Sequence, residues 1–576
     1  MKAIRRRRPA RAPRPARPPG APRAPGALRN AGILLLVVGV TWGAQEWRAA
    51  PEDGTAKTPL LWTPMSETVV CPGPETLTVP EGGRPVRPPG PVVVGALAAP
   101  ASGTAEDREA PAVNSASLSN LDGRGSVDLP RVLKGAGLLV SPREGPGAVR
   151  LLSRGKPGTG DEAEAPLVAA TQLTLARTGE LRGLVGSACA VPSADQWLVG
   201  GGTAVGRRAR LLLANPTAAA VMVDITVHGP SGPVEAAAGD SVVVAPGRQR
   251  ALFLDALAPD LQTVAVHVCT HGGRVAALLH DSLLRGVIAG GVDDVVAGNA
   301  PALRQLVPGI SVEFPSGGSA RSPELPRDPR APGAGGVRVV VPGQQDAVVR
   351  VRLSGPGGET ALPGGGVVTV RAGASVDVPL TGVPEGVYTA VVESDVPVGA
   401  GAFVGRARAG SERALGAAPP PGTPAAELAW VPSAGSVHGS AAVALPAPAA
   451  PGRAGPVQSS ALLTLMAPLG GARVRVFGWG SSGRGEREQR VDVPAGRTVT
   501  VPVRRGTTGL SLEVESGNRV VGAVVLTVGD TAGELVSVIG IRPDRPGGAH
   551  PPEVVQDPAL GVAVGPGPAR GQVSER

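Results

Sequence analysis

Short apolar segments that alternate with polar residues and end at Gly or Pro constrain this chain most. The clearest unit spans Arg208–Asp281. Within residues 221–228 the apolar side chains share one face: Val221, Val223, Ile225 and Val227. The polar or flexible ones share the other: Met222, Asp224, Thr226 and His228. This alternation is typical of a strand buried on one side. Breaks at Gly and Pro about every ten residues predict an antiparallel β-sandwich.

The unit recurs at nearly constant spacing. Its turn glycine, Gly247, corresponds to Gly373 and Gly496, at offsets of 126 and 123 residues. Strand ends recur in step with these turns: Gly229-Pro230, Gly355-Pro356 and Gly478-Trp479. Constant spacing with matched turn residues indicates repeated domains.

Each unit is also expected to close with a β-hairpin. Four predicted hairpins indicate four copies, the first of them diverged, and their turns lie at Thr178-Gly179, Gly272-Gly273, Ser394-Asp395 and Gly517-Asn518. A lead-in segment precedes three copies: Trp197-Leu198-Val199, Leu306-Val307-Pro308 and Trp430-Val431-Pro432. We interpret Trp197 and Trp430 as core residues of their repeats.

The predicted fold is therefore all-β. It consists of tandem immunoglobulin-like antiparallel β-sandwich domains behind one N-terminal transmembrane or signal segment. Gly and Pro supply 84 and 62 of the 576 residues, and they gather in turns, linkers and tails, so folded segments survive between them. The expected parts are a basic disordered tail (1–30), a signal anchor or signal peptide (31–47), a diverged β domain (66–190), three β-sandwich repeats (195–300, 301–407 and 428–543), a linker (408–427) and a disordered tail (544–576).

The N-terminus predicts the compartment. Residues 1–30 carry ten basic side chains and no acidic one, so the net charge of +9 arises there. Residues 31–44 follow without a single charge, a run that is short for a full span of about 20 residues but suits a signal segment. A basic flank beside an apolar run follows the positive-inside rule. A nucleic-acid arm is disfavoured because residues 1–30 contain no aromatic side chain for base stacking.

We expect an uncleaved anchor, which gives a single-pass cell-membrane protein with an extracellular C-terminal region. The alternative is a cleaved signal peptide and a secreted chain. Cysteine usage agrees with export, because Cys71 and Cys189 can pair in an oxidising compartment. Two free thiols are the other interpretation of these residues, and Cys269 is left over.

Several motifs resemble those of an uncharacterised family of exported actinobacterial proteins that is known only as a domain of unknown function. They are Val70-Cys-Pro-Gly-Pro74, Leu181-Arg-Gly-Leu184 before Cys189, Trp197-Leu-Val-Gly-Gly-Gly202 and Leu212-Leu-Ala-Asn-Pro-Thr217. The similarity covers about 66–540 of this sequence. It implies an envelope or secreted location, with a weak indication of envelope glycan, and no known activity.

A search for metal ligands yields one weak set. His267, Cys269 and His271 share a face of one predicted strand, and the predicted hairpin places His280 opposite Ala265 on that face. Soft sulfur and imidazole ligands suit zinc or copper. The other repeats carry neither His nor Cys at the matching positions, so we predict a solvated or inter-domain strand face, and no metal or cofactor.

Catalytic motifs are not convincing. Gly480-Ser-Ser-Gly483 is interpreted as a turn, since no strand-to-helix elbow surrounds it. Gly155-Lys156 does not have the upstream glycine of a phosphate loop. Asp293-Asp294 is interpreted as part of a loop, because no partner acid follows at a useful spacing. The sequence therefore predicts that the protein is not an enzyme.

One candidate ligand patch remains. Phe477 and Trp479 share a predicted strand face with Arg473 and Arg475. Such a set suits sugar stacking or a cation–π cluster, and it also suits packing at a domain boundary.

The expected function is that of an extracytoplasmic multi-domain structural or interaction protein of the cell envelope. The alternative is a glycan-binding or envelope-polysaccharide assembly accessory protein. The expected partners are the membrane, through residues 31–47, and an envelope protein or glycan of unknown identity, with no nucleic acid.

Overall fold

The structure is a computed structural model. It describes residues 61–62, 66–74, 92–99, 113–129, 137–143, 147–155, 158–159, 167–234, 239–313, 335–362, 364–406, 426–449, 457–481, 485–529 and 534–543. All of these belong to one unit, Leu61–Arg576. The predicted tails, the membrane segment 31–47 and most of the linker 408–427 lie outside the described residues. Within the described ranges, no helix is long and apolar enough to cross a membrane.

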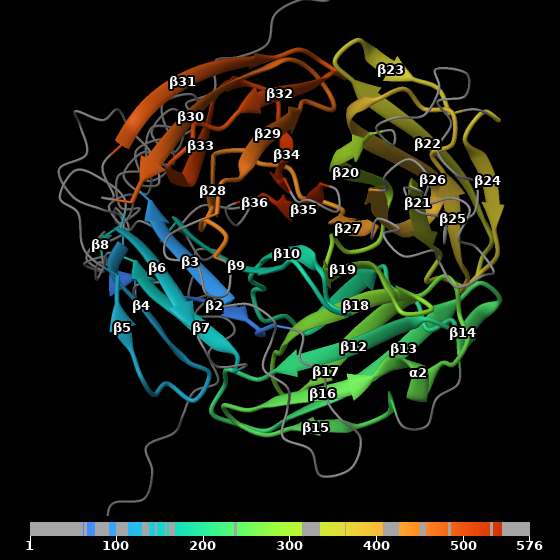
Figure 1. The fold of residues 1–576 in the computed structure, drawn as a ribbon, viewed down its shortest axis with the longest axis horizontal. Helices are drawn as coiled ribbons and strands as arrows, with labels where there is room; N and C mark the ends of the chain where they lie inside the picture. The colour runs from blue at the N-terminus through green and yellow to red at the C-terminus, as the bar shows by residue number, and fades with distance from the viewer. Residues whose placement is uncertain are drawn as a thin grey trace, which may run out of the picture. The chain divides into compact units, whose positions relative to one another are not determined.

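The described residues are almost entirely β-structure, as the sequence predicts, and they build four sandwiches (Figure 1). Sandwich 1 has two four-stranded sheets, ordered β2-β7-β4-β5 and β10-β9-β3-β6. Its strands are β2 (Ser66–Cys71), β3 (Val92–Ala99), β4 (Val113–Asn120), β5 (Val127–Asp128), β6 (Gly137–Arg143), β7 (Val149–Gly155), β9 (Leu167–Ala176) and β10 (Gly183–Ala188). A separate small sheet pairs β1 (Leu61–Trp62) with β8 (Gly158–Thr159).

Sandwich 2 repeats this arrangement with sheets β11-β17-β13-β14 and β16-β12-β18-β19, and β15 pairs with β13. Its elements are β11 (Asp195–Val199), β12 (Arg207–Ala214), β13 (Val221–Gly229), β14 (Gly232–Val234), β15 (Val242–Val244), β16 (Gln249–Phe253), α2 (Leu254–Leu257), β17 (Ala265–His271), β18 (Ala276–Arg285) and β19 (Ile288–Val296).

Sandwich 3 contains a strand of 21 residues, β26, that passes through both sheets and joins them into one eight-stranded sheet. Its strands are β20 (Ala302–Val312), β21 (Gly335–Val340), β22 (Ala347–Gly355), β23 (Gly358–Thr360), β24 (Val367–Val370), β25 (Ser375–Pro379), β26 (Gly386–Arg406) and β27 (Glu427–Pro432).

Sandwich 4 has sheets β31-β30-β33-β28-β36 and β32-β29-β34-β35. Its strands are β28 (Ser440–Ala444), β29 (Ser460–Met466), β30 (Ala472–Gly480), β31 (Gly485–Val493), β32 (Thr498–Pro502), β33 (Thr507–Gly517), β34 (Val521–Val528), β35 (Leu535–Gly540) and β36 (Arg542–Pro543).

All four sandwiches share one topology, including the diverged first copy. In each, the first strand of the copy pairs on one side of the sandwich and the last long strand on the other; in sandwich 4 the two-residue β36 follows this last long strand and pairs with β28. The four last strands are β10, β19, β27 and β35. Val and Leu side chains fill the space between the two sheets of each copy, as in residues Val221, Val223 and Ile225 of sandwich 2.

The predicted closing hairpins are wrong in three copies. In sandwich 2, β17 pairs with β11 and β13, whereas β18 pairs with β12 and β19, so the two strands lie in opposite sheets. The inward residues of both strands belong to one core cluster: Val264, Val266, Val268, Val275, Ala277 and Leu279. Two strands that bury their faces against each other must lie across the sandwich, not side by side. Only the first predicted hairpin, β9–β10, is a paired one.

The lead-in segment at Trp430, predicted to begin the last repeat, belongs to sandwich 3. Strand β27, which carries Trp430, pairs with β26 and is therefore the last strand of sandwich 3. Strand β28 is the true first strand of sandwich 4, so the predicted domain start at 428 is corrected to near Ser440. Trp197 and Leu306 do lie on first strands, β11 and β20. The similar segments at Trp197 and Trp430 thus form a first strand and a last strand, respectively. Only their pairing with other strands distinguishes these two positions.

The repeated turn glycines form contacts between sandwiches. The carbonyl oxygen of Gly373 accepts a hydrogen bond from His228 Nδ1 of sandwich 2, at 2.8 Å. The carbonyl oxygen of Gly496 accepts one from Ser354 Oγ of sandwich 3, also at 2.8 Å. Gly247 lies against Asp122 of sandwich 1. One interface type therefore joins sandwich 1 to 2, 2 to 3 and 3 to 4.

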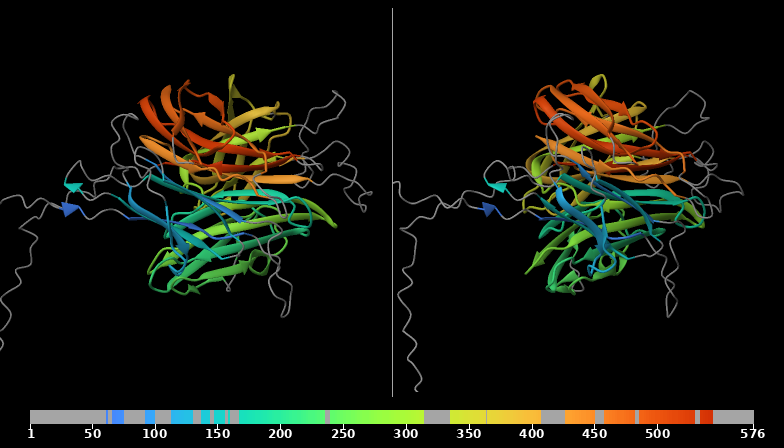
Figure 2. Two further views of the ribbon diagram at one scale, coloured as in Figure 1. Left: turned by 60° about the vertical axis from the view of Figure 1, so that its left-hand side comes forward. Right: turned by 90° about the vertical axis from the view of Figure 1, so that its left-hand side faces the viewer.

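Sandwich 4 returns to sandwich 1 and closes the cycle. Leu97 and Leu167 of sandwich 1 pack against Phe477 and Trp479 of sandwich 4. A second apolar cluster, which includes Leu184 and Leu535, joins the same two sandwiches. Figures 1 and 2 show each sandwich beside the next, with the first and second (blue to green) next to the third and fourth (yellow to red).

The turn glycines allow a matched test of this interface. Both Gly373 (φ +72°) and Gly496 (φ +64°) are left-handed, but a Cβ on Gly373 would lie 2.5 Å from Pro233 Cδ, whereas a Cβ on Gly496 would meet no atom within 4 Å. Gly496→Ala should cost about 1–2 kcal/mol of unfolding free energy through backbone strain alone. Gly373→Ala should cost more, because it also separates sandwiches 2 and 3. Equal losses in chemical denaturation would contradict the interface.

Candidate functional site

The four last strands meet at the centre of the cycle. β10 contacts β19 and β35, and β27 contacts the same two strands (Figure 1). Glycines permit this approach: a Cβ on Gly291 (φ +123°) would lie 2.4 Å from the backbone nitrogen of Leu428. A Cβ on Gly183 would lie 2.5 Å from Val292 Cγ1. Backbones therefore come closer here than side chains of ordinary size would allow.

Polar side chains on these strands form a buried network that we call the central polar cluster. Its members are Ser187 on β10, Asp293 and Asp294 on β19, Glu427 and Trp430 on β27, Ser537 on β35, and His280 and Asp281 on β18. All are at most 6 % exposed. Because buried polar groups are costly unless they are hydrogen-bonded, the bonds within this cluster determine how the four sandwiches fit together.

Asp293 joins three sandwiches. Its Oδ2 accepts a hydrogen bond from the backbone nitrogen of Trp430 at 2.7 Å, and its Oδ1 accepts one from Ser537 Oγ at 3.3 Å. Ser537 Oγ in turn accepts a bond from the backbone nitrogen of Gly186 at 2.9 Å. Strand β19 of sandwich 2 is thereby linked to β27 and, through β35, to β10.

Asp294 joins sandwiches 1 and 2. Its Oδ2 accepts bonds from Ser187 Oγ at 2.7 Å and from Gln172 Nε2 at 3.1 Å. Its Oδ1 contacts Nδ1 of the buried His280. A carboxylate with this many donors is held in one orientation.

Asp281 anchors Trp430. Its carboxylate accepts two bonds from the Arg207 guanidinium and one, at 2.9 Å, from Trp430 Nε1. The guanidinium carbons of Arg207 and Arg338 lie 5.7 and 5.0 Å from the centroid of the Trp430 ring. Sandwich 3 is therefore fastened to sandwich 2 by an indole that is hydrogen-bonded at its edge and contacted by cations.

Two acids of the cluster have strongly shifted affinities for protons. Desolvation, reinforced by the charge of Asp294, holds the pKa of Asp293 well above its ordinary value. Desolvation also holds the pKa of Glu427 well above its usual range, and Asp293 adds to this effect while Arg182 and Arg406 oppose it. Glu427 Oε1 accepts a bond from the backbone nitrogen of Leu184 at 3.3 Å, whereas no described group hydrogen-bonds to Oε2. Both acids are therefore more stable in the protonated form here than in water.

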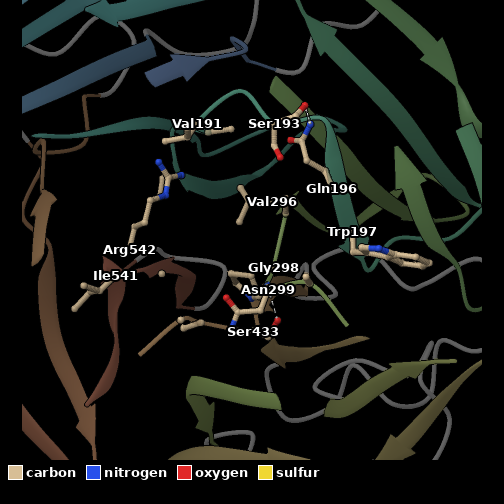
Figure 3. Close-up of a pocket in the computed structure, with 18 of the residues that line it drawn as sticks. Val191, Ser193, Gln196, Trp197, Val296, Gly298, Asn299, Ser433, Ile541 and Arg542 are labelled. Atoms are coloured by element: carbon tan, nitrogen blue, oxygen red, sulfur yellow. Dashed lines mark hydrogen bonds between the residues drawn. The ribbon is translucent and has the colours of Figure 1, made fainter. Parts of the chain in front are cut away.

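A cavity of about 240 Å³ lies where the last strands end (Figure 3). Its walls come from the segments that follow β10, β19, β27 and β35, together with the start of β11. The lining residues that matter below are Val191, Val296, Asn299, Ser433, Ile541 and Arg542. Every sandwich thus contributes to this one cavity.

The weak metal candidates do not come together. His267, Cys269 and His271 do share a face of β17, but His280 lies on β18 in the opposite sheet, which corrects the predicted pairing with Ala265. His267 stacks on Trp197 with ring centroids 4.2 Å apart, and His271 Nε2 lies 2.8 Å from Asp224 Oδ2. Among the described residues, no three His, Cys, Asp or Glu side chains are arranged to hold a metal ion.

The predicted ligand patch is largely covered. Phe477 and Trp479 are buried between sandwiches 4 and 1, and Trp479 Nε1 donates to Ser511 Oγ at 2.9 Å. Arg475 lies over the Phe477 ring, and the exposed Arg473 bonds Asp492. These aromatic rings cannot stack on a sugar, so the domain-boundary interpretation of these residues is the correct one.

Cys71 and Cys189 form a disulfide with Cα atoms 4.4 Å apart, and it connects the start of sandwich 1 to the residue that follows its last strand. Cys269 is a free thiol of intermediate exposure. The 118-residue separation between the bonded cysteines places the stabilisation near roughly 4–5 kcal/mol in the loop-entropy model.

Sequence reasoning missed the central polar cluster. Asp293 and Asp294 are not in a loop: both lie within strand β19 and are buried. The signal that could have identified them is the run Gly291-Val-Asp-Asp-Val-Val296, in which two acids interrupt an otherwise apolar strand. Their partners come from three other sandwiches, so local spacing could not identify them. Of the predicted turn at residues 480–483, Gly480 is the last residue of β30 and Ser481 lies in a turn. Ser482 and Gly483 lie outside the described residues.

The raised pKa values predict a pH-dependent stability. A group whose pKa is raised on folding stabilises the native state fully below its unfolded pKa, and this contribution is lost as the pH rises through the folded pKa. Glu427→Gln should therefore raise the melting temperature relative to the wild type at pH 8 and lose this advantage near pH 4. Glu359→Gln, at an exposed ion pair with Arg352, should show no such trend. A pH-independent difference between Glu427→Gln and the wild type would contradict this assignment.

Removal of one hydroxyl should weaken the junction. Ser537→Ala leaves the buried Gly186 nitrogen without its acceptor and should cost about 1–3 kcal/mol of unfolding free energy. Ser516→Ala, on an exposed stretch of β33, serves as the control and should stay within about 0.5 kcal/mol of the wild type. The measurement is denaturant unfolding of both variants, and equal stabilities would show that the Ser537 bonds contribute nothing.

Comparison with protein families gives a match to this chain. No curated protein matches the sequence. A family model described as "Family of unknown function (DUF5719)" matches residues 153–504, which is more than half of the chain and extends from sandwich 1 into sandwich 4. This match confirms the resemblance to an uncharacterised family. Because the match covers more than half of the sequence, the chain belongs to this family of unknown function, DUF5719.

Proposed function

We propose that the protein is an extracytoplasmic scaffold of the cell envelope that presents binding surfaces in a fixed geometry. The observation that carries the proposal is the closed cycle of four sandwiches. Tandem sandwiches joined only end to end move relative to one another, whereas interfaces between domains that are extensive and apolar restrict such motion. Here each sandwich is fastened to two others and to the central polar cluster.

Independent features support the proposed location. The Cys71–Cys189 disulfide is of the kind that persists in oxidising compartments. The basic residues 1–30 followed by the apolar residues 31–44 are a pattern typical of exported, membrane-anchored chains. We propose that residues 31–47 hold the protein at the cell membrane with residues after 47 outside, where an envelope protein or glycan contacts the sandwiches.

A fractionation experiment tests this proposal. A C-terminally tagged full chain should remain in the membrane fraction at its full mass and be digested by protease added outside intact cells. Alkylation in denaturant without reductant should then modify one thiol, Cys269, and after reduction it should modify three. A full-mass chain in the cytosolic fraction with three reactive thiols would rule out the proposed location. A chain in the medium, shortened at its N-terminus, would replace the anchor with a cleaved signal.

Chemical crosslinking in the same cells tests the scaffold role. Lys156 is the last lysine in the sequence, so sandwiches 2, 3 and 4 contain no lysine for amine-directed reagents. Crosslinking of these sandwiches to envelope neighbours therefore uses carboxylate-directed or photoreactive reagents. These reagents should recover envelope components that are absent from a control in which the anchor, residues 31–47, is expressed without the four sandwiches. Recovery of the chain alone would contradict an interaction role.

A further inference from the structure

The cavity at the ends of the last strands is not explained by the cycle itself. A repeated assembly needs its interfaces filled, and elsewhere apolar clusters fill them. At this junction about 240 Å³ remains open, whereas a single water needs roughly 10–15 Å³. The space is therefore large enough for a small organic molecule. It also reaches solvent, because the lining residues Asp195, Ala300 and Arg542 are exposed.

The charge in the cavity is asymmetric. Of the described residues that line it, only Asp195 and Arg542 have acidic or basic side chains. The Asp195 carboxylate lies 3.4 Å from His267 Nε2 on the outer face of the sheet, which draws it away as a partner for a ligand. Arg542 is held at the wall by one bond of 2.7 Å from its Nη2 to the carbonyl oxygen of Cys189. A guanidinium has five N–H donors, and the bond to Cys189 uses one of them.

The surroundings of Arg542 make its charge effective. Protein atoms desolvate the guanidinium and lower its pKa from the ordinary value, and the charge of Glu67 opposes this shift, while the side chain still reaches solvent through the cavity. An Arg in such a partly dehydrated place binds a carboxylate more strongly than an Arg on an open surface. Figure 3 shows Arg542 on one wall, with Asn299 and Ser433 on another. The Ser433 hydroxyl accepts a bond from the backbone nitrogen of Asn299 at 2.9 Å, so the hydroxyl proton of Ser433 points elsewhere.

The remaining walls are mostly apolar. Val191, Val296, Ile541 and Pro432 surround the space, and the side chain of Gln196 is already bonded to backbone groups of residues 193, 275 and 277. A cavity with apolar walls and one accessible cation suits a ligand with an apolar body and one anionic end.

We propose that this cavity binds a small organic carboxylate, with its anionic end on Arg542 and its apolar part against Val191, Val296 and Pro432. Binding there would connect segments of all four sandwiches. The inference does not depend on the proposed location of the protein, because it concerns only the cavity and its walls.

Calorimetric titration of the full chain with hexanoate tests the proposal. Hexanoate should bind, and its neutral analogue hexanamide should bind at least about tenfold more weakly, since it cannot form the charge-assisted bonds. Arg542→Met keeps the side-chain length without the charge and should weaken hexanoate binding by a similar factor. The matched control is Arg504→Met, which removes an exposed Arg from a separate, smaller cavity of sandwich 4 and should leave binding unchanged.

A second variant protects the test against misfolding. Ala300 is exposed at the cavity wall, so Ala300→Phe fills space without disturbing a core, and it should weaken hexanoate binding with an unchanged melting temperature. The proposal is overturned if hexanoate does not bind, if hexanamide binds equally well, or if Arg542→Met and Ala300→Phe both bind like the wild type. Binding of inorganic phosphate in place of hexanoate would also overturn it, because the apolar walls would then have no role.

Discussion

The structure depends on one constraint: four strands that end four equivalent sandwiches must meet at a single place. Each of these strands lies at an edge of its own sheet, and within the described residues none of them pairs with another by sheet hydrogen bonds. Side chains therefore provide the links. Asp293 and Asp294 on β19 accept bonds from β10, β27 and β35, and glycines such as Gly183 and Gly291 keep the backbones close. Without these residues the four sandwiches would be joined only end to end and would not form a closed cycle.

The interfaces around this centre are made by repetition. Each sandwich contacts the preceding copy through its turn glycine and the next copy through the end of the strand equivalent to β13. The same contact can therefore be repeated from one copy to the next. His228 with Gly373, and Ser354 with Gly496, show this contact with different donors at the same position. The last interface does not repeat it, because sandwich 4 meets sandwich 1 through Leu97, Phe477 and Trp479 instead. The divergence of the first copy is the expected result, since its outer surface closes the cycle.

A closed cycle also explains a low aromatic content. Large aromatic cores are dispensable when Val, Leu and Ala fill each sandwich and when inter-domain surfaces add further burial. The few large rings are placed where sandwiches join: Trp430 between sandwiches 3 and 2, and Trp479 between 4 and 1. Buried carboxyl groups at the centre carry a cost in stability, and the raised pKa values of Asp293 and Glu427 reduce it by favouring the neutral form of each acid. The cavity beside them lies at the one point that all four copies share.

The sequence by itself determined the all-β class, the repeated unit and its spacing, because alternation and turn glycines are local properties. It also contained the Cys71–Cys189 pair, though not the geometry that joins them. Tertiary structure alone decided which strands pair: β17 and β18 were expected to be neighbours but face each other across the core. It alone assigned Trp430 to sandwich 3 and buried Asp293-Asp294 at the centre. Those outcomes rest on contacts between separate segments of the chain, and the bonds of Asp293 to Trp430 and Ser537 span more than a hundred positions, which no local pattern encodes.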